Sequence, residues 1–303
     1  IREYVIQEKL GTGSYGIVYK ATKPNDPNIY VIKQISLIGL TKAQINQVET
    51  EAKVLSLIKS KYVVKYFDSF EENNSLNIVM EYCDDGDLCK FICECKLEST
   101  PLPEEIIWKI FIQIAIGLNS IHKIKILHRD LKTLNIFLKQ GMGAKIGDLG
   151  VAKVLDKFNF ATTIIGTPYY LSPEMCENKP YDDKSDVWAL GCILYELCTF
   201  KHPFNARSQG ALIMTIIQAG QEHILTPYSK DLQYLIDCIL EKDNKKRPSC
   251  KQILSMPSVI AWSKRLNFYQ AIVNECYLMN YSYISNVNSN IMNRNNNIMN
   301  RNR

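Results

Sequence analysis

The chain has 303 residues and a mass of 34.8 kDa, with 46% hydrophobic and 22% charged residues. This composition is typical of globular domains and excludes a wholly disordered, collagen-like or small disulfide-rich protein. The net charge is +5, from 36 Lys and Arg against 31 Asp and Glu, and the excess is spread along the chain, so neither a nucleic-acid partner nor a membrane partner is predicted.

No apolar stretch reaches the ~18 uninterrupted residues that a membrane span needs, and no signal-peptide pattern opens the chain. The ten cysteines form no Cys-x-x-Cys pair, which favours reduced thiols over a zinc site. We therefore expect a cytoplasmic protein. Because the first residue is Ile rather than Met, we also expect a piece of a longer protein.

The first 83 residues alternate apolar and polar side chains, rich in Val, Ile and Tyr, and predict five strands. These strands cover residues 4–10, 17–21, 29–35, 63–70 and 76–82. Between the third and the fourth strand, residues 42–59 carry apolar side chains at helical spacing. They predict one helix, with Glu51 at the edge of its apolar stripe.

From about residue 87 the pattern becomes helical. Pro103, followed by Glu104 and Glu105, is a favourable helix start, because proline suits the first turn and acids suit the positive end of the helix dipole. This helix is predicted to end near residue 122, and further helices are predicted at residues 186–198, 209–219, 230–241 and 249–255.

After Pro257 the helical signal weakens, and the asparagine-rich residues from about 281 to 303 predict a disordered tail. The predicted plan is a first lobe at residues 1–83, a second lobe at residues 84–258 and an extension at residues 259–303.

A glycine-rich segment lies between the first two predicted strands. It reads Gly11, Thr12, Gly13, Ser14, Tyr15 and Gly16. Glycines let the main chain approach a phosphate closely, and the N–H groups of such a turn can point at anionic oxygens. A dinucleotide-binding fold shares this spacing, but there a helix follows the glycines. Here a strand follows the glycines, which favours a β-hairpin that covers the phosphates of a nucleotide.

Lys33 lies at the end of the third predicted strand, where an unpaired ammonium group would be costly to bury. Glu51 in the following helix is its candidate partner. The pair would leave the lysine free to hold phosphate oxygens.

Two acidic residues and one asparagine follow at a spacing that suits a magnesium–nucleotide site. Asp130 and Asn135 belong to the segment His128-Arg129-Asp130-Leu131-Lys132-Thr133-Leu134-Asn135, and Asp148 belongs to Lys145-Ile146-Gly147-Asp148-Leu149-Gly150. Mg²⁺ prefers hard oxygen ligands and usually takes one or two carboxylates together with substrate phosphates.

In this order, over about residues 4–258, the motifs resemble those of eukaryotic protein kinases. The resemblance implies an α+β, bilobal protein kinase fold. A small antiparallel β-sheet lobe (the N-lobe) with one regulatory helix would sit on a larger, mainly helical lobe (the C-lobe), with ATP between them. Lys132 and the run Gly166-Thr167-Pro168-Tyr169-Tyr170 resemble the serine/threonine type, and residues 80–88 and 167–174 are similar to the NIMA-related (Nek) kinases.

The resemblance also implies roles for individual residues. Asp130 would accept the proton of the substrate hydroxyl, Lys132 would steady the γ-phosphate, and Lys33, paired with Glu51, would hold the α- and β-phosphates. Asn135 and Asp148 would bind Mg²⁺, or Mn²⁺ in its place, with ATP as co-substrate. The implied ATP-binding residues are Gly11, Thr12, Gly13, Ser14, Tyr15, Gly16, Val18, Val31, Lys33, Met80, Glu81 and Cys83.

Further roles are implied outside the nucleotide site. Glu174 would pair with Arg247, and Asp186 would anchor the catalytic loop. Thr163 is the expected phosphosite of the activation segment, and Thr167 belongs to the expected substrate platform. His128 is expected to be a packing residue. Glu81 and Cys83 would bind adenine through the main chain, so their side chains need not matter.

Three positions depart from the family pattern. Leu149 replaces the usual Phe after the metal-binding Asp, Leu134 stands where Nek kinases often carry Gln, and Val31 stands where kinases usually have Ala. None removes a catalytic group, which argues against a pseudokinase scaffold. A small-molecule phosphotransferase, the other alternative, would lack the segment at residues 148–174.

The implied function is a non-specific serine/threonine protein kinase that acts on protein substrates, with a Nek-like role in the cell cycle, the centrosome or the cilium. Its expected place is the cytoplasm, including the cytoskeleton, centrosome or cilium, or the nucleus. Dimerisation or scaffolding would use regions outside this chain.

Overall fold

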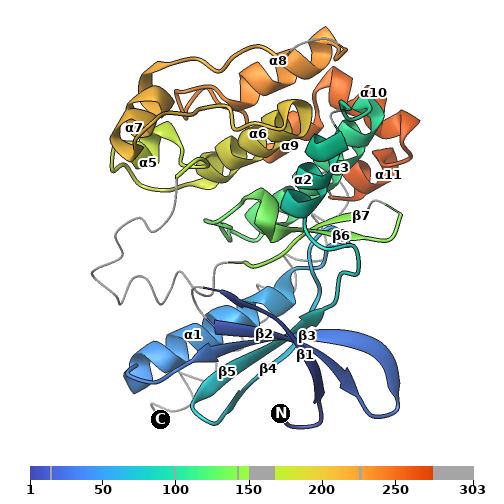
Figure 1. The fold of residues 1–303 in the computed structure, drawn as a ribbon, viewed down its shortest axis with the longest axis vertical. Helices are drawn as coiled ribbons and strands as arrows, with labels where there is room; N and C mark the ends of the chain where they lie inside the picture. The colour runs from blue at the N-terminus through green and yellow to red at the C-terminus, as the bar shows by residue number, and fades with distance from the viewer. Residues whose placement is uncertain (14–15, 99, 142, 150–167, 225–226, 276–303) are drawn as a thin grey trace, which may run out of the picture.

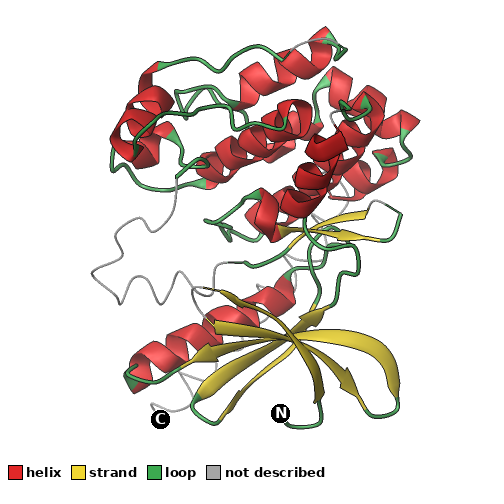
Figure 2. Cartoon of the chain, viewed as in Figure 1, coloured by secondary structure: helices red, strands yellow, loops and turns green. Residues whose placement is uncertain are grey.

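The computed structural model describes residues 1–13, 16–98, 100–141, 143–149, 168–224 and 227–275, apart from the side chains of Gln47, Thr50, Glu51 and Val54. These residues form a small lobe built on a sheet and a larger helical lobe, joined by a short connection (Figures 1 and 2). The bilobal α+β fold predicted from the sequence is confirmed.

The small lobe contains an antiparallel sheet with strand order β1-β2-β3-β5-β4. Its strands are β1 (Val5–Gly13), β2 (Gly16–Lys23), β3 (Asp26–Ser36), β4 (Tyr66–Glu72) and β5 (Ser75–Glu81). All five were predicted, but β4 begins three residues later than expected. Val63 instead forms an isolated bridge with Ile146 of the other lobe.

Helix α1 (Lys42–Val54) covers one face of this sheet. Thr41 and Gln44 form a capping box that fixes its start. Val48 and Ala52 are fully buried in one cluster with sheet residues, namely Ile35, Leu76 and Ile78. The predicted helix ran to residue 59, whereas in the structure a 3₁₀ turn at Leu55–Leu57 ends it.

The large lobe packs its helices around one apolar core. They are α2 (Leu88–Glu98), α3 (Glu104–Lys123), α5 (Pro173–Cys176), α6 (Asp183–Thr199), α7 (Gln209–Gln218), α8 (Lys230–Ile239), α9 (Cys250–Leu254), α10 (Pro257–Arg265) and α11 (Tyr269–Val273). Helix α6 begins three residues before the predicted start because Asp182 caps it by accepting from the N–H groups of Lys184 and Ser185.

A two-stranded sheet lies on the large lobe where it faces the small one. Strands β6 (Ile136–Lys139) and β7 (Gly143–Ile146) pair antiparallel. The 3₁₀ turn Thr133–Asn135 leads directly into β6. Figure 1 shows this pair between α3 and the N-lobe sheet.

Helices α10 and α11 were not predicted, and they extend the packed lobe beyond residue 258. Val259 and Ile272 are buried in the core of the large lobe. Trp262 stacks on Trp108 of α3 with ring centroids 5.7 Å apart. The asparagine-rich tail predicted from residue 281 lies outside the described residues.

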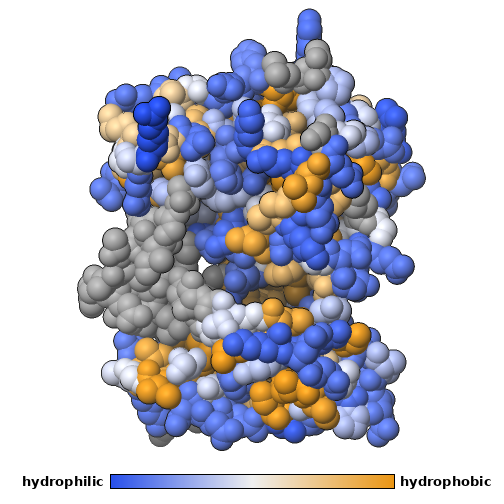
Figure 3. Space-filling view, viewed as in Figure 1, coloured by the Kyte–Doolittle hydropathy of each residue, from blue (hydrophilic) through white to orange (hydrophobic). Residues whose placement is uncertain are grey.

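No helix within the described part of the chain is long and apolar enough to cross a membrane. On the face drawn in Figure 3, hydrophilic residues cover most of both lobes, and apolar residues gather in patches on the small lobe.

Candidate functional site

The glycine-rich segment forms the turn of the β1–β2 hairpin. Gly13 and Gly16 are the last paired positions of the two strands, and residues 14–15 between them lie outside the described residues. A Cβ atom on Gly16 would lie 1.9 Å from the carbonyl oxygen of Gln34, so only glycine allows this close approach to β3. The predicted hairpin, with a strand after the glycines, is confirmed.

The register of the sheet brings the predicted nucleotide residues together. Val18 in β2 lies opposite Lys33 in β3, and Val31 lies opposite Met80 in β5. These positions lie on three neighbouring strands, β2, β3 and β5, and β5 leads into the connection between the lobes. Their role in nucleotide binding stays a prediction.

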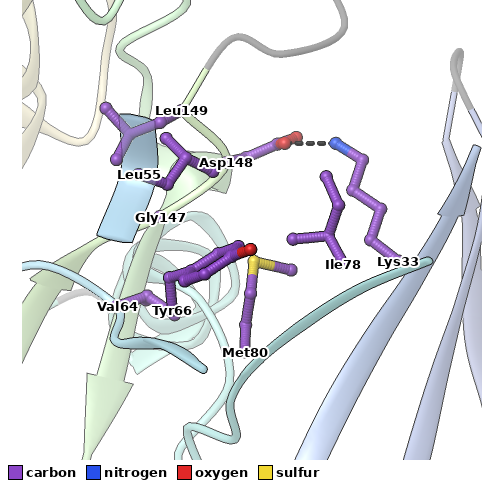
Figure 4. A pocket seen from close by; sticks show the side chains of 9 residues that line it. All are labelled: Lys33, Leu55, Val64, Tyr66, Ile78, Met80, Gly147, Asp148 and Leu149. Atoms are coloured by element: carbon purple, nitrogen blue, oxygen red, sulfur yellow. Dashed lines mark hydrogen bonds and ion pairs between the residues drawn. The ribbon is translucent and has the colours of Figure 1, made fainter. Parts of the chain in front are cut away.

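A pocket opens between the lobes behind these strands (Figure 4). It is lined by Lys33, Leu55, Val64, Tyr66, Ile78, Met80, Gly147, Asp148 and Leu149. Leu149, the departure from the family Phe, thus adds an apolar side chain to this wall. Met80 is one of the pocket's lining residues, and its place behind the adenine stays a prediction.

Lys33 forms an ion pair with the carboxylate of Asp148 across this pocket. The side chain of Lys33 is only 13% exposed, so its charge needs this partner. Glu51 lies in α1, and its side chain is outside the described residues, so its pairing with Lys33 stays a prediction.

Asp130 stands at the centre of a second group of polar side chains. Its Oδ2 atom accepts hydrogen bonds from Lys132 Nζ at 2.8 Å and from Asn135 Nδ2 at 3.1 Å. One third of its side chain is exposed, which leaves room for a substrate. The expected base, phosphate-binding lysine and metal-binding amide are therefore in direct contact.

The buried carboxylate of Asp186 holds the segment before Asp130. It accepts hydrogen bonds from the backbone N–H groups of His128 and Arg129, both at 2.9 Å. These bonds support Arg129 in a left-handed conformation, with φ 66°. The contact to the catalytic loop expected of Asp186 is present.

Two further side chains hold Asp186, and neither was predicted. His122 Nε2 lies 2.8 Å from its Oδ2, and the hydroxyl of Tyr181 donates to Oδ1. Burial would lower the pKa of His122, but the hydrogen bond and charge of Asp186, together with Cys250, outweigh burial, and the pKa rises to about 10. The sequence signal was weak, because His122 lies in the last turn of α3, a helix whose other residues are mostly core.

His128 is fully buried and links the two functional segments. Its Nε2 atom contacts the carbonyl oxygen of Gly147 at 2.9 Å, and its Nδ1 atom accepts from the N–H of Asp130 at 3.3 Å. Burial lowers its pKa, so the ring is neutral at neutral pH. This geometry fits the packing role predicted for it.

Asn135 and Asp148 have the donor chemistry for a hard divalent cation. The Nδ2 atom of Asn135 is occupied by the carbonyl and carboxylate oxygens of Asp130, which leaves the amide oxygen as the ligand atom. The N–H of Gly147 donates to the carbonyl of Asn135 at 2.9 Å and so ties the two segments together. The described residues contain no group of three or more His, Cys, Asp or Glu that could hold a metal, so phosphate would have to share this ion.

Glu174 and Arg247 form the predicted pair deep in the large lobe. Two parallel hydrogen bonds of 2.8 and 3.0 Å join them, and both side chains are almost fully buried. Burial would raise the pKa of Glu174, but the hydrogen bonds and charge of Arg247, with the hydrogen bond from Ser185, together outweigh burial and lower the pKa to about 2.

The connection between the lobes holds contacts that were not predicted. The carboxylate of Glu81 accepts hydrogen bonds from Lys139 Nζ at 2.7 Å and from Lys145 Nζ at 2.8 Å. Partners this far along the chain cannot be recognised from local pattern. Burial, with the nearby Glu81 charge, raises the pKa of Cys83 to about 11, so its thiol stays protonated.

The substrate side of the site is described only in part. Tyr170 donates to Glu196 at 2.6 Å and lies 3.0 Å from the hydroxyl of Thr133, which links the segment after residue 167 to the catalytic loop. The sequence reasoning assigned no role to Glu196. Thr163 and Thr167 lie outside the described residues.

Comparison with known proteins identifies relatives. The protein kinase domain family matches residues 4–259. Over 255 residues the chain is 43% identical to the serine/threonine-protein kinase Nek1 of Mus musculus, a match that covers 84% of this chain and 21% of that protein.

Two further relatives carry related names. The serine/threonine-protein kinase Nek5 of Homo sapiens is 44% identical over 257 residues, with 84% of this chain and 36% of that protein covered. Nek8 of Danio rerio is 38% identical over 275 residues, with 90% and 39% covered. The chain therefore spans about a fifth to two fifths of the length of these relatives.

The family match runs from the first strand of the small lobe into α10, and it includes both groups of polar side chains around Asp130 and Asp148. This chain belongs to the protein kinase family, and its kinase domain is similar to those of the Nek serine/threonine kinases.

Proposed function

We propose that this chain is an active serine/threonine protein kinase that transfers the γ-phosphoryl group of ATP to hydroxyl groups of protein substrates. The observation that carries the proposal is the contact of Asp130, Lys132 and Asn135 in one loop, with Asp148 paired to Lys33 beside it.

The small lobe would hold the nucleotide. The main chain around Glu81 and Cys83 supplies groups for adenine, Val18, Val31 and Met80 supply apolar contacts, and the glycine hairpin covers the phosphates. Lys33 would hold the α- and β-phosphates, with Glu51 as its further partner. The pair of Lys33 with Asp148 puts this cation next to the expected metal ligand.

The large lobe would carry out the transfer. Asp130 orients the substrate hydroxyl and takes its proton, while Lys132, which contacts the same carboxylate, steadies the γ-phosphate. Little covalent chemistry is left to the protein, so positioning and charge stabilisation supply most of the rate.

Asn135 and Asp148 would hold Mg²⁺, or Mn²⁺, against the phosphates. The bound cation supplies charge neutralisation of the phosphate oxygens. The bonds from Asn135 Nδ2 to Asp130 orient the amide for this ligand role.

A pseudokinase scaffold is not favoured, because each residue that the chemistry requires is present. We extend the proposal to a Nek-like role in the cell cycle, the centrosome or the cilium. We place the protein in the cytoplasm, with the cytoskeleton, the centrosome, the cilium and the nucleus as its sites of action. Similarity to the Nek kinases over 84% of this chain supports the Nek-like part of the proposal.

A peptide-array phosphorylation assay with ATP and Mg²⁺ tests the proposal. We expect transfer to Ser and Thr peptides and none to Tyr peptides, and Mn²⁺ should replace Mg²⁺. An array that stays blank with wild-type protein, under conditions where ATP binds, would contradict the proposal and favour the scaffold.

A further inference from the structure

The carboxylate of Glu81 is held from three sides at the point where the two lobes meet. Lys139 of β6 and Lys145 of β7 each donate to a different oxygen, at 2.7 and 2.8 Å. The backbone N–H of Lys65, just before β4, donates to the second oxygen at 3.2 Å. Glu81 itself is the last residue of β5. We call Glu81, Lys139 and Lys145 the hinge clasp.

The clasp differs from an ordinary surface ion pair. The side chains of Glu81 and Lys145 are only 14% and 15% exposed, so this pair is the buried part of the clasp, while Lys139 is 45% exposed. Lys23 and Glu3, an ion pair at 2.6 Å in the small lobe, are 35% and 54% exposed. Exposed pairs contribute little because water screens them, but partly buried charges depend on each other. The hydrogen bonds from the two lysines outweigh the effect of burial and lower the pKa of Glu81.

The two lysines belong to the strand pair that lies between the expected metal ligands Asn135 and Asp148 in the chain. Strand β6 begins immediately after Asn135, and β7 ends two residues before Asp148. The clasp therefore joins the last residue of β5 to the same strand pair that positions Asn135 and Asp148.

Main-chain bonds hold the next part of the connection on the same strand. The N–H of Leu138 donates to the carbonyl of Gly86 at 2.8 Å, and the N–H of Asp85 donates to the carbonyl of Leu138 at 3.2 Å. Residues 85–87 are thus held on β6 by main-chain contacts, with no ion pair involved in these bonds. At the small-lobe end, main-chain bonds also hold β7, because the N–H of Val64 donates to the carbonyl of Ile146 at 2.8 Å and the N–H of Ile146 donates to the carbonyl of Tyr62 at 2.9 Å. Glu81 adds a side-chain attachment at the end of the connection itself.

We propose that Lys139 and Lys145 are positioning residues for ATP. By clasping Glu81, they set the distance between the adenine-binding main chain and the metal ligands Asn135 and Asp148. The proposal rests on the proposed kinase function, since adenine is taken to bind at residues 81–83. Without the clasp, the nucleoside and phosphate ends of ATP would be held by parts that shift against each other, which weakens ATP binding more than it slows transfer from bound ATP.

The test measures KM for ATP, kcat and the dissociation constant of ATP for Glu81→Gln, Lys145→Met and the double variant. Glu81→Gln keeps the main chain that would bind adenine. Loss of a charged hydrogen bond predicts a rise of about tenfold in KM and in the dissociation constant, with kcat changed by less than about threefold. The double variant should be no worse than either single one, because both remove the same interaction. Lys145→Arg should restore binding.

Lys23→Met is the matched control, since it removes a lysine from an exposed ion pair of the same lobe, and it should change none of these values. Thermal melting of each variant separates loss of the clasp from loss of the fold. Unchanged ATP affinity in folded Glu81→Gln and Lys145→Met would overturn the proposal, as would a rise in kcat, which would make the clasp a restraint. If wild-type protein transfers no phosphate, the kinase proposal fails, while the ATP dissociation constants still decide whether the clasp positions the nucleotide.

Discussion

Lys33 has 13% of its side chain exposed and pairs with Asp148, which lies 115 residues further along the chain. The sequence could predict that a lysine in a buried strand needs an acidic partner. It could not predict Asp148, because that contact depends on how the lobes meet. In the same way, the sequence identified the residue types of the catalytic loop but not the contacts of Glu81 or of His122.

Replacing Lys33 with Met should abolish most activity without unfolding the small lobe. Met matches the length of the lysine stem and leaves Asp148, which is 38% exposed, able to reach water. Loss of a cation that holds transferring phosphates predicts a fall in kcat on the order of 100-fold or more. Steady-state kinetics with ATP titration checks this. Full activity with unchanged ATP affinity would show that another lysine holds the phosphates.

Thr163 is our candidate for an activating phosphosite. A phosphate adds nearly two negative charges, which Arg129, beside Asp130, could bind through charge-assisted hydrogen bonds. Thr163→Ala should therefore lower activity strongly while ATP still binds, and Thr163→Glu should restore it only in part. Kinetics before and after phosphatase treatment provides the measurement. Equal rates for the treated protein, the untreated protein and Thr163→Ala would place the switch elsewhere.

At the scale of elements, capping and periodicity predicted most helices and strands. Helix α3 begins at Glu104 and ends at Lys123, close to the predicted limits, because its start signal and its apolar pattern are both strong. Helices α10 and α11 were missed. Helix α11 has five residues, too few for a periodic pattern, and it is held by packing of Ile272 rather than by its own sequence.

The pair between Glu174 of α5 and Arg247 predicts a pH dependence of stability. The folded-state pKa of Glu174, about 2, lies below its ordinary value of 4.5. The stabilisation is therefore complete above about pH 5 and is lost as the pH falls through 4.5 towards 2. Melting temperatures between pH 7 and pH 3 should show this loss in wild-type protein.

Glu174→Gln should destabilise the large lobe at pH 7 by ~3–5 kcal/mol, because it leaves Arg247 buried and without its ionic partner. It should also reduce the acid dependence between pH 5 and pH 3. Glu105→Gln is the control, because Glu105 pairs with Arg265 at the surface, where both side chains are more than half exposed. If Glu174→Gln keeps the wild-type acid profile, the pair does not set it.

At the scale of the whole molecule, the sequence predicted two lobes and an extension from residue 259, and part of that extension packs on the second lobe. Its core includes Val259 and Ile272, and Phe268 lies edge-on to Tyr62, with ring centroids 6.3 Å apart. The carbonyl of Tyr62 accepts from the N–H of Ile146 at 2.9 Å. The extension thus contacts the segment that joins α1 to the sheet, close to the strand before Asp148.

Removal of residues 266–303 should therefore destabilise the fold. Loss of the buried Ile272 and of the contact between Phe268 and Tyr62 predicts a melting temperature lower by roughly 5–10 °C. A chain that ends at Glu275 keeps α11 and is the control. Equal melting temperatures for the two shortened chains would show that α11 contributes nothing to stability.

The central claim is that Asp130 accepts the substrate proton in an active kinase, and Asp130→Asn tests it most directly. Asn has nearly the same shape and can still accept from Lys132 and from the N–H groups around it, but it cannot take a proton. We expect kcat for peptide phosphorylation to fall by ~100- to 10,000-fold, with ATP affinity and melting temperature close to those of the wild type. A variant that retains more than about a tenth of wild-type turnover would contradict the account. Its loss of less than about tenfold would be smaller than the usual effect of removing a general base.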